Sequence, residues 1–193
     1  MHSRSRASPS RRLLGLGCAL ALVLPASLAF GKVFHSRKEA LELAFPGADR
    51  VESETFILDD AQAEAVEERA RSRLDTRLVT IHTGFDASEP LGHAIIDVHT
   101  VRTHPEAFLL LVSPAGRLES LRLLAFHEPE EYIPPARWLR QFEGRGLSDG
   151  LRVSRDIDGI SGATLTARAV TSGARRALAL YEVLIRDGGS QKP

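Results

Sequence analysis

The stretch Asp158-Gly159-Ile160-Ser161-Gly162-Ala163-Thr164-Leu165-Thr166 is a loop of small and polar residues that runs directly into the last long helical pattern of the chain. Apolar residues then recur at helical spacing, at Val170, Ala174, Ala177, Leu178, Tyr181, Leu184 and Ile185. The charged residues of this segment are predicted to fall mostly on the other side: Arg168, Arg175, Arg176, Glu182 and Arg186. A loop with hydroxyl groups and a glycine at a helix start presents free backbone N–H groups and the positive end of the helix dipole. Such a helix start favours a bound phosphate.

Two interpretations of the stretch follow from its residues alone. In the first, Ser161, Thr164 or Thr166 is an ordinary N-cap and Gly162 turns the chain. In the second, residues 159–163 are a nucleophile elbow, because they differ from G-x-S-x-G by one methyl group. A hydrolase of that type needs its histidine after the serine, but the last histidine is His127. Residues 151–156 are also too charged to form the buried strand that an elbow requires, so we set the hydrolase aside.

The seven residues from Asp158 to Thr164 resemble the flavinylation motif D-G-x-[S/T]-G-A-T of the FMN-binding domain family. Leu165-Thr166 resembles the usual continuation of that motif. The family includes the covalently flavinylated subunits of the sodium-pumping NADH:quinone oxidoreductase and of related ferredoxin-oxidising membrane complexes. In these proteins a flavin transferase uses FAD and a metal ion to esterify the final threonine with FMN, releasing AMP. The resemblance implies that Thr164 carries covalent FMN and that Asp158 is read during modification. It implies a cofactor-binding role for the rest of the motif: Gly159, Ser161, Gly162, Ala163, Leu165 and Thr166.

Elementary chemistry agrees with this implied modification. A threonine hydroxyl is a poor nucleophile unless it is activated, so an outside enzyme must supply the base and the metal. The target must then be reachable, and small neighbours such as Gly162 and Ala163 favour access. The phosphodiester keeps one negative charge, which a helix start near Leu165 stabilises by roughly 0.3–1 kcal/mol. Arg168, one turn into the helix, is expected to be a solvated surface arginine or to contact this charge.

The rest of the chain resembles the family more faintly. Gly92 lies at the start of a predicted strand where family members often carry a glycine-rich segment. Residues 127–129 follow the last predicted strand, where the respiratory subunits carry a glutamate-threonine-proline-glycine stretch that borders the flavin ring. Residues 130–132 depart from that pattern. We expect this loop to approach the isoalloxazine with Glu128 and Tyr132 nearest; the alternative is a solvated run of glutamates. Trp138 is either a stacking partner of the ring or a core residue.

The first residues have the pattern of a secretory signal. Arg4, Arg6, Arg11 and Arg12 precede an apolar run over residues 13–30, and Ser27-Leu28-Ala29 offers the small residues that a signal peptidase reads. We predict residues 1–29 as a signal peptide and residues 30–193 as the mature FMN-binding domain, with a periplasmic or extracytoplasmic location. The alternative is an uncleaved membrane anchor.

Composition limits the other function classes. The chain has 193 residues and a formal charge of zero, which gives no reason to expect a nucleic-acid partner. Cys18 lies inside the apolar run, so the predicted mature chain has no thiolate ligand or disulfide. His93 and His99 are six residues apart and share a face of a predicted strand, but no carboxylate lies at a recognisable ligand spacing. We predict no metal site and expect ordinary strand and turn histidines.

The pattern of elements predicts an α+β domain, a mainly antiparallel twisted sheet flanked by helices. Helices are predicted over residues 35–45, with a Ser36–Glu39 capping box, and from Asp59 or Asp60 to about Leu74. A short helix follows Pro134-Pro135. Strands are predicted over residues 51–58, 77–85, 91–101, 107–112 and 117–126, with a hairpin turn at residues 114–116.

Three functions remain open from the sequence. The first is an extracytoplasmic electron carrier, whose FMN passes electrons between membrane or periplasmic redox partners after a flavin transferase has attached it. The second is a small flavin-dependent reductase with His127 or Tyr132 as proton donor to a small-molecule acceptor. The third is an unmodified domain that binds a partner.

Overall fold

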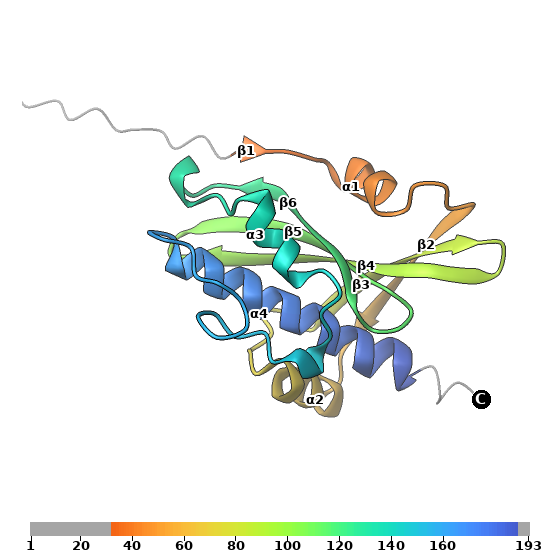
Figure 1. Cartoon of the computed structure of the whole chain (residues 1–193). Helices are drawn as coiled ribbons and strands as arrows, with labels where there is room; N and C mark the ends of the chain where they lie inside the picture. The colour runs from red at the N-terminus through yellow and green to blue at the C-terminus, as the bar shows by residue number, and fades with distance from the viewer. Residues whose placement is uncertain (1–31, 189–193) are drawn as a thin grey trace, which may run out of the picture.

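The computed structural model describes residues 32–188, and the predicted signal peptide, residues 1–29, lies outside them (Figure 1). The strands are β1 (Lys32–Val33), β2 (Arg50–Ile57), β3 (Leu78–Asp86), β4 (Glu89–Val101), β5 (His104–Val112) and β6 (Leu118–Phe126). The α-helices are α1 (Arg37–Ala44), α2 (Asp60–Ala70), α3 (Ala136–Leu139) and α4 (Thr164–Leu180). Shorter helical turns are η1 (Glu130–Tyr132), η2 (Arg140–Phe142), η3 (Leu147–Asp149) and η4 (Tyr181–Arg186). No helix among residues 32–188 is both long and apolar enough to span a bilayer.

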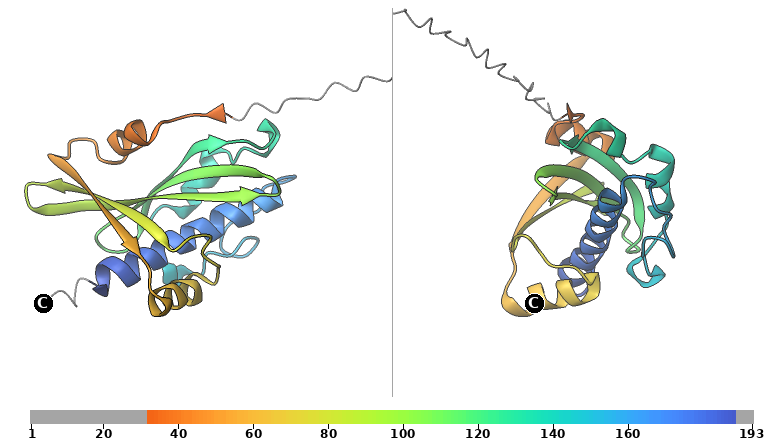
Figure 2. Two further views of the ribbon diagram at one scale, coloured as in Figure 1. Left: turned by 180° about the vertical axis from the view of Figure 1, so that it is seen from behind. Right: turned by 90° about the vertical axis from the view of Figure 1, so that its left-hand side faces the viewer.

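The six strands form one antiparallel sheet in the order β1-β6-β5-β4-β3-β2. The sheet curves around α4, which lies along one face, while α1 covers part of the other face (Figure 2). Each strand from β2 to β5 pairs with the next one along the chain. Short loops connect β3 to β4, β4 to β5 and β5 to β6, whereas helix α2 lies between β2 and β3. The predicted α+β class with a mainly antiparallel sheet is confirmed.

The main hydrophobic core fills the space between the sheet and α4. Apolar residues of the central strands, among them Ile95 and Phe108, face the small side chains of α4, among them Ala167 and Ala174. A second, smaller cluster lies under α1. Its residues are Ala40, Ala44, Phe45, Ala94, Leu109, Leu111 and Leu124. The two clusters lie on opposite faces of one sheet, as expected from the alternation of side chains along a strand.

Helices α1 and α2 begin with the N-caps that the sequence predicts, but α2 ends earlier than predicted. Ser36 caps α1 and forms the predicted capping box, in which the backbone N–H of Ser36 donates to Glu39 Oε2 at 2.7 Å. Asp59 caps α2 in the same way. The predicted extension of this helix to about Leu74 is wrong. It ends at Ala70, because Arg71 adopts a left-handed conformation (φ 50°).

The prediction that the charged residues of α4 lie mostly away from the core is wrong for Arg175 and Arg176, which are both buried. Arg175 donates to the backbone oxygens of Ala70 and Arg69, at 2.6 Å and 2.9 Å, and so satisfies carbonyls at the end of α2. Arg176 donates to both carboxylate oxygens of Asp97 on β4, at 2.8 Å and 2.9 Å. Helix α4 is therefore covered by α2 as well as by the sheet.

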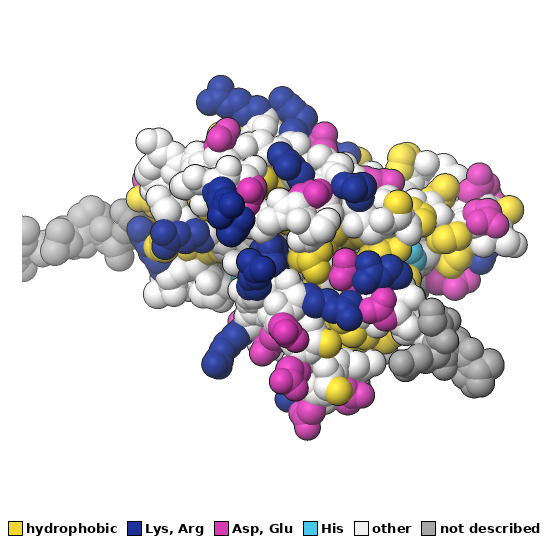
Figure 3. Space-filling view, turned by 60° about the horizontal axis from the view of Figure 1, so that its bottom comes forward, with side chains coloured by type: hydrophobic (Ala, Val, Ile, Leu, Met, Phe, Trp, Pro, Cys, Tyr) yellow, Lys and Arg dark blue, Asp and Glu magenta, His cyan; other side chains and the backbone are white. Residues whose placement is uncertain are grey.

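Charges of both signs are interspersed on the face shown in Figure 3. The ion pairs of the described residues include Arg69 with Asp187, at 2.7 Å, and Arg117 with Asp149, at 3.3 Å.

Candidate functional site

Two side chains hold the first residue of the motif loop in position. The indole Nε1–H of Trp138 donates to the backbone oxygen of Asp158 at 2.7 Å, and Gln141 Oε1 accepts from the backbone N–H of Asp158 at 3.0 Å. The Trp138 ring is buried and packs edge-on against Phe142, with ring centroids 5.3 Å apart. Trp138 is therefore a core residue that anchors the loop. Neither hydrogen bond could be predicted from the sequence.

The motif loop ends in an uncapped helix. Gly162 has φ +80°, a left-handed conformation that favours glycine, and the backbone N–H of Ala163 donates to the oxygen of Ile160 at 3.1 Å. Helix α4 begins at Thr164 and runs for 17 residues, and no side chain caps its N-terminus. The N-cap interpretation of Ser161, Thr164 or Thr166 is therefore wrong. No side chain occupies the first backbone N–H groups of α4, and the uncapped start of a long helix favours binding of an anion.

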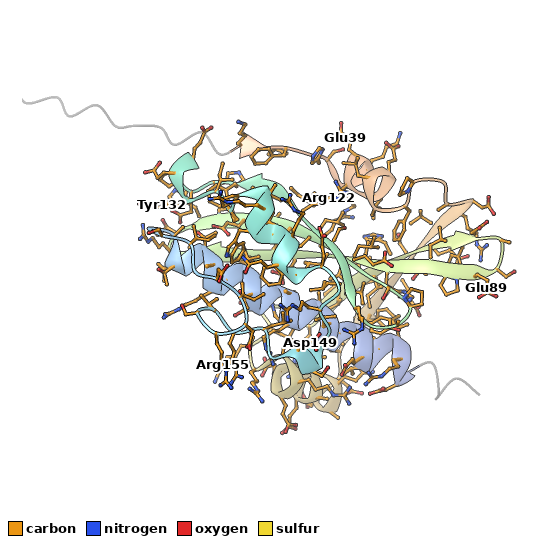
Figure 4. The ribbon with its side chains drawn as sticks, in the orientation of Figure 1. Glu39, Glu89, Arg122, Tyr132, Asp149 and Arg155 are labelled. Atoms are coloured by element: carbon orange, nitrogen blue, oxygen red, sulfur yellow. The ribbon has the colours of Figure 1, made fainter. Side chains whose placement is uncertain are left out.

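A cavity of about 210 Å³ lies against this helix start. Its walls come from the end of β4, the segment after β6 and the motif, and its lining residues are Val101, Arg102, Glu128, Tyr132, Gly162, Ala163, Thr164, Leu165 and Thr166. The fold thus places Glu128 and Tyr132 in the same cavity wall as Thr164. The expectation that they lie nearest to the flavin ring stays a prediction. Glu128 is buried, whereas Glu130 and Glu131 are exposed, so the run of glutamates is not uniformly solvated. Tyr132 is labelled beside the start of α4 in Figure 4.

The carboxylate oxygen Oε1 of Glu128 is buried and has no hydrogen-bond partner among the described residues. The nitrogen nearest to this oxygen in an ion-pair geometry is Nδ1 of His104, at 3.5 Å. A buried carboxylate oxygen without a donor is costly, so this oxygen is available to accept a hydrogen bond from a ligand or from water. FMN fits the site on these grounds: its phosphate suits the uncapped helix start, and the ring imide N–H is a donor of the kind that Glu128 lacks.

Arg102 is a cavity residue that the sequence analysis missed. It occupies the first position of the two-residue loop between Val101 and His104, which are paired in the β4–β5 hairpin. Its φ of 54° lies in the left-handed region, and this backbone conformation costs about 1 kcal/mol for a residue other than glycine or asparagine. The guanidinium lies 5.6 Å from the centroid of the Tyr132 ring, in a cation–π arrangement. An arginine where a hairpin favours glycine is the signal that could have revealed it.

The remaining residues of the motif face a different depression, of about 450 Å³. Asp158, Gly159 and Ser161 line it together with Trp138, Gln141 and Arg137. The structure therefore divides the predicted site between two surfaces, with Thr164 on one and Asp158 on the other. The exposed position of Asp158 agrees with the expectation that an external enzyme reads it.

A buried polar network lies on β4 and β5 beneath α4. His99 Nδ1 lies 2.7 Å from Asp97 Oδ2, and Nε2 lies 3.3 Å from Glu106 Oε2. Burial alone would lower the pKa of His99, but hydrogen bonds to Asp97 and Glu106 outweigh it and raise the pKa to about 9. Burial alone would raise the pKa of Asp97, but His99 and Arg176 bring it below its usual value. His93 shares this face, within 5.2 Å of the Tyr181 ring.

These histidines are engaged with protein groups, and residues 32–188 contain no group of three or more potential ligands arranged for a metal ion. His82 Nδ1 shares a hydrogen bond of 2.6 Å with Ser53 Oγ, and His93 Nδ1 shares one of 3.0 Å with Thr83 Oγ1.

Comparison with known proteins agrees with the geometry. No curated protein matches the chain. The family model described as the FMN-binding domain matches residues 105–179. The matched segment contains Glu128, Tyr132 and the whole motif loop, and ends inside α4, while Arg102 lies just before it. Residues 105–179 thus match the FMN-binding domain family, and this match supports flavin binding by the chain.

Proposed function

We propose that this protein is an extracytoplasmic electron-transfer module that carries FMN as a phosphoester on Thr164. One observation carries the proposal: Thr164 is exposed, is the first residue of an uncapped 17-residue helix, and opens on a cavity with an unpartnered buried carboxylate. A phosphate ester at that hydroxyl would lie at the positive end of α4.

The modification is a phosphoryl-group transfer from FAD, made by a flavin transferase with its metal ion. The Thr164 oxygen forms a bond to the FMN phosphorus, the pyrophosphate bond of FAD breaks, AMP leaves, and the hydroxyl proton is released. The chain itself has to present the hydroxyl. Trp138 and Gln141 hold Asp158, and Gly162 turns the loop so that Thr164 stays exposed.

The attached flavin would supply the redox chemistry, and the protein would supply its position and electrostatics. The segment 1–29 supports export of the domain, and the partners we propose are membrane or periplasmic redox proteins. A carrier of this kind exchanges electrons with artificial donors and shows no saturable turnover with small organic acceptors. Saturable turnover would favour the small-molecule reductase instead.

Intact-mass measurement tests the attachment. The protein should be exported from a host that has the transferase, alongside Thr164→Val and the matched control Thr166→Val, which removes a buried hydroxyl of the same cavity. We expect an added mass of about 438 Da, FMN less one water, on the parent and on Thr166→Val. Thr164→Val should lack it. An equal gain in both variants, or no gain in the parent, would contradict the proposed attachment.

A further inference from the structure

We infer that the guanidinium of Arg102 lies against the flavin and stabilises the negative charge of the reduced ring. The inference rests on the proposed FMN at Thr164 and concerns a residue outside the segment that matches the family model. Arg102 is the one cationic side chain among the nine residues that line the cavity beside Thr164.

The conformation of Arg102 is the first argument. Its φ of 54° is unfavourable for an arginine, and a two-residue hairpin loop accepts glycine or asparagine there without this strain. Strained backbone that persists in a native structure is found preferentially at ligand sites. Here the strained residue is also the one that carries a charge into the cavity wall.

The orientation of Arg102 is the second argument. Its guanidinium lies 5.6 Å from the centroid of Tyr132, another cavity residue. Tyr132 comes from η1, after β6, so residues from two separate segments hold the cation at the cavity. No described carboxylate lies within ion-pair distance of Arg102, and the buried carboxylate of the cavity, Glu128, is nearest to His104. The charge of Arg102 is therefore available to a ligand.

The charge balance of the flavin identifies what this cation would act on. Two electrons from a reductant and one proton from solvent convert the neutral oxidised ring into a reduced ring with one negative charge. A neighbouring cation stabilises that charge and so raises the reduction potential, because it favours the reduced form over the neutral oxidised form. The phosphoester is equally charged in both forms, so a cation that met only the ester would leave the potential much less affected.

Potentiometric titration with dithionite tests the inference on mature protein whose flavin content has first been verified by mass. The variants are Arg102→Gln and Arg102→Gly, and the matched control is Arg122→Gln, which removes an exposed arginine of β6 (Figure 4). We expect both Arg102 variants to lose at least tenfold in the ratio of reduced to oxidised flavin at a given potential. For a two-electron couple this is a midpoint about 30 mV lower. Arg122→Gln should keep the parent value.

Arg102→Gly separates this role from a structural one. Glycine relieves the left-handed strain, so we expect the melting temperature of this variant to equal or exceed that of the parent while its potential falls. If both Arg102 variants kept the midpoint potential of the parent, the inference would be overturned and the FMN attachment would still stand. The same holds if Arg122→Gln lowered the midpoint potential as much as the Arg102 variants do. A parent protein without the added FMN mass would overturn the proposed function, and the inference with it.

Discussion

The anchoring of Asp158 by two side chains leads to a prediction about the modification itself. In Gln141→Met the side chain keeps its length but loses the oxygen that accepts from the Asp158 N–H at 3.0 Å. One neutral hydrogen bond contributes about 1 kcal/mol, so local opening of the loop should become about fivefold more frequent. In Trp138→Phe the 2.7 Å bond is lost and a gap forms in the core, which together cost about 2–3 kcal/mol.

Both changes should slow flavinylation, because the transferase needs the loop in one conformation. The assay follows the added FMN mass over time with purified transferase, at a temperature where every variant is folded. Because Trp138 and Gln141 hold the same residue, Asp158, the double variant should be slowed less than the product of the single effects.

Phe142→Leu is the matched control for stability. It removes volume from the same buried aromatic pair without touching Asp158, and should lower the free energy of unfolding by about 1–2 kcal/mol. Its folded form should be modified at the parent rate. Amide exchange of Asp158 gives a readout that does not depend on flavin. If Gln141→Met were modified at the parent rate and the Asp158 amide exchanged no faster, the anchoring argument would be refuted.

Three further predictions concern stability and the loop. Folding raises the pKa of His99 from its usual value of 6.5 to about 9, so protonated His99 stabilises the folded chain. Its contribution to the free energy of unfolding, on the order of 3 kcal/mol, is present below about pH 6.5 and lost as the pH rises through about 9. Denaturant titrations should show this fall in the parent and not in His99→Gln. Gly173→Ala should destabilise by about 1–3 kcal/mol despite the better helix former, because its Cβ would lie 2.5 Å from Asp97 Oδ2; a higher melting temperature would contradict this. Gly162→Ala should lower the free energy of unfolding by about 1 kcal/mol, because its φ is +80°, and should slow flavinylation. Gly47→Ala is the control: its φ is +86° and it also has open space around it, so it should lose as much stability without slowing flavinylation.

The local structure could be predicted from the amino-acid sequence alone, and the motif was sufficient to indicate a flavin. Periodicity and caps predicted most of the element boundaries, because an N-cap such as Ser36 and a turn glycine such as Gly47 act within a few residues of their own position. The motif from Asp158 to Thr164 indicated FMN for a similar reason, since its residues are consecutive in the chain.

The surroundings of Thr164 depend on the tertiary fold. Glu128 and Tyr132 reach the helix start because β6 and η1 end beside α4, and Arg102 joins them from the β4–β5 hairpin. The burial of Arg175 was equally invisible in the periodicity of α4, because its partners are carbonyls at the end of α2, about a hundred residues earlier. Contacts between distant segments depend on how the sheet curves around the helix, and a pattern within one segment carries no information about that curvature.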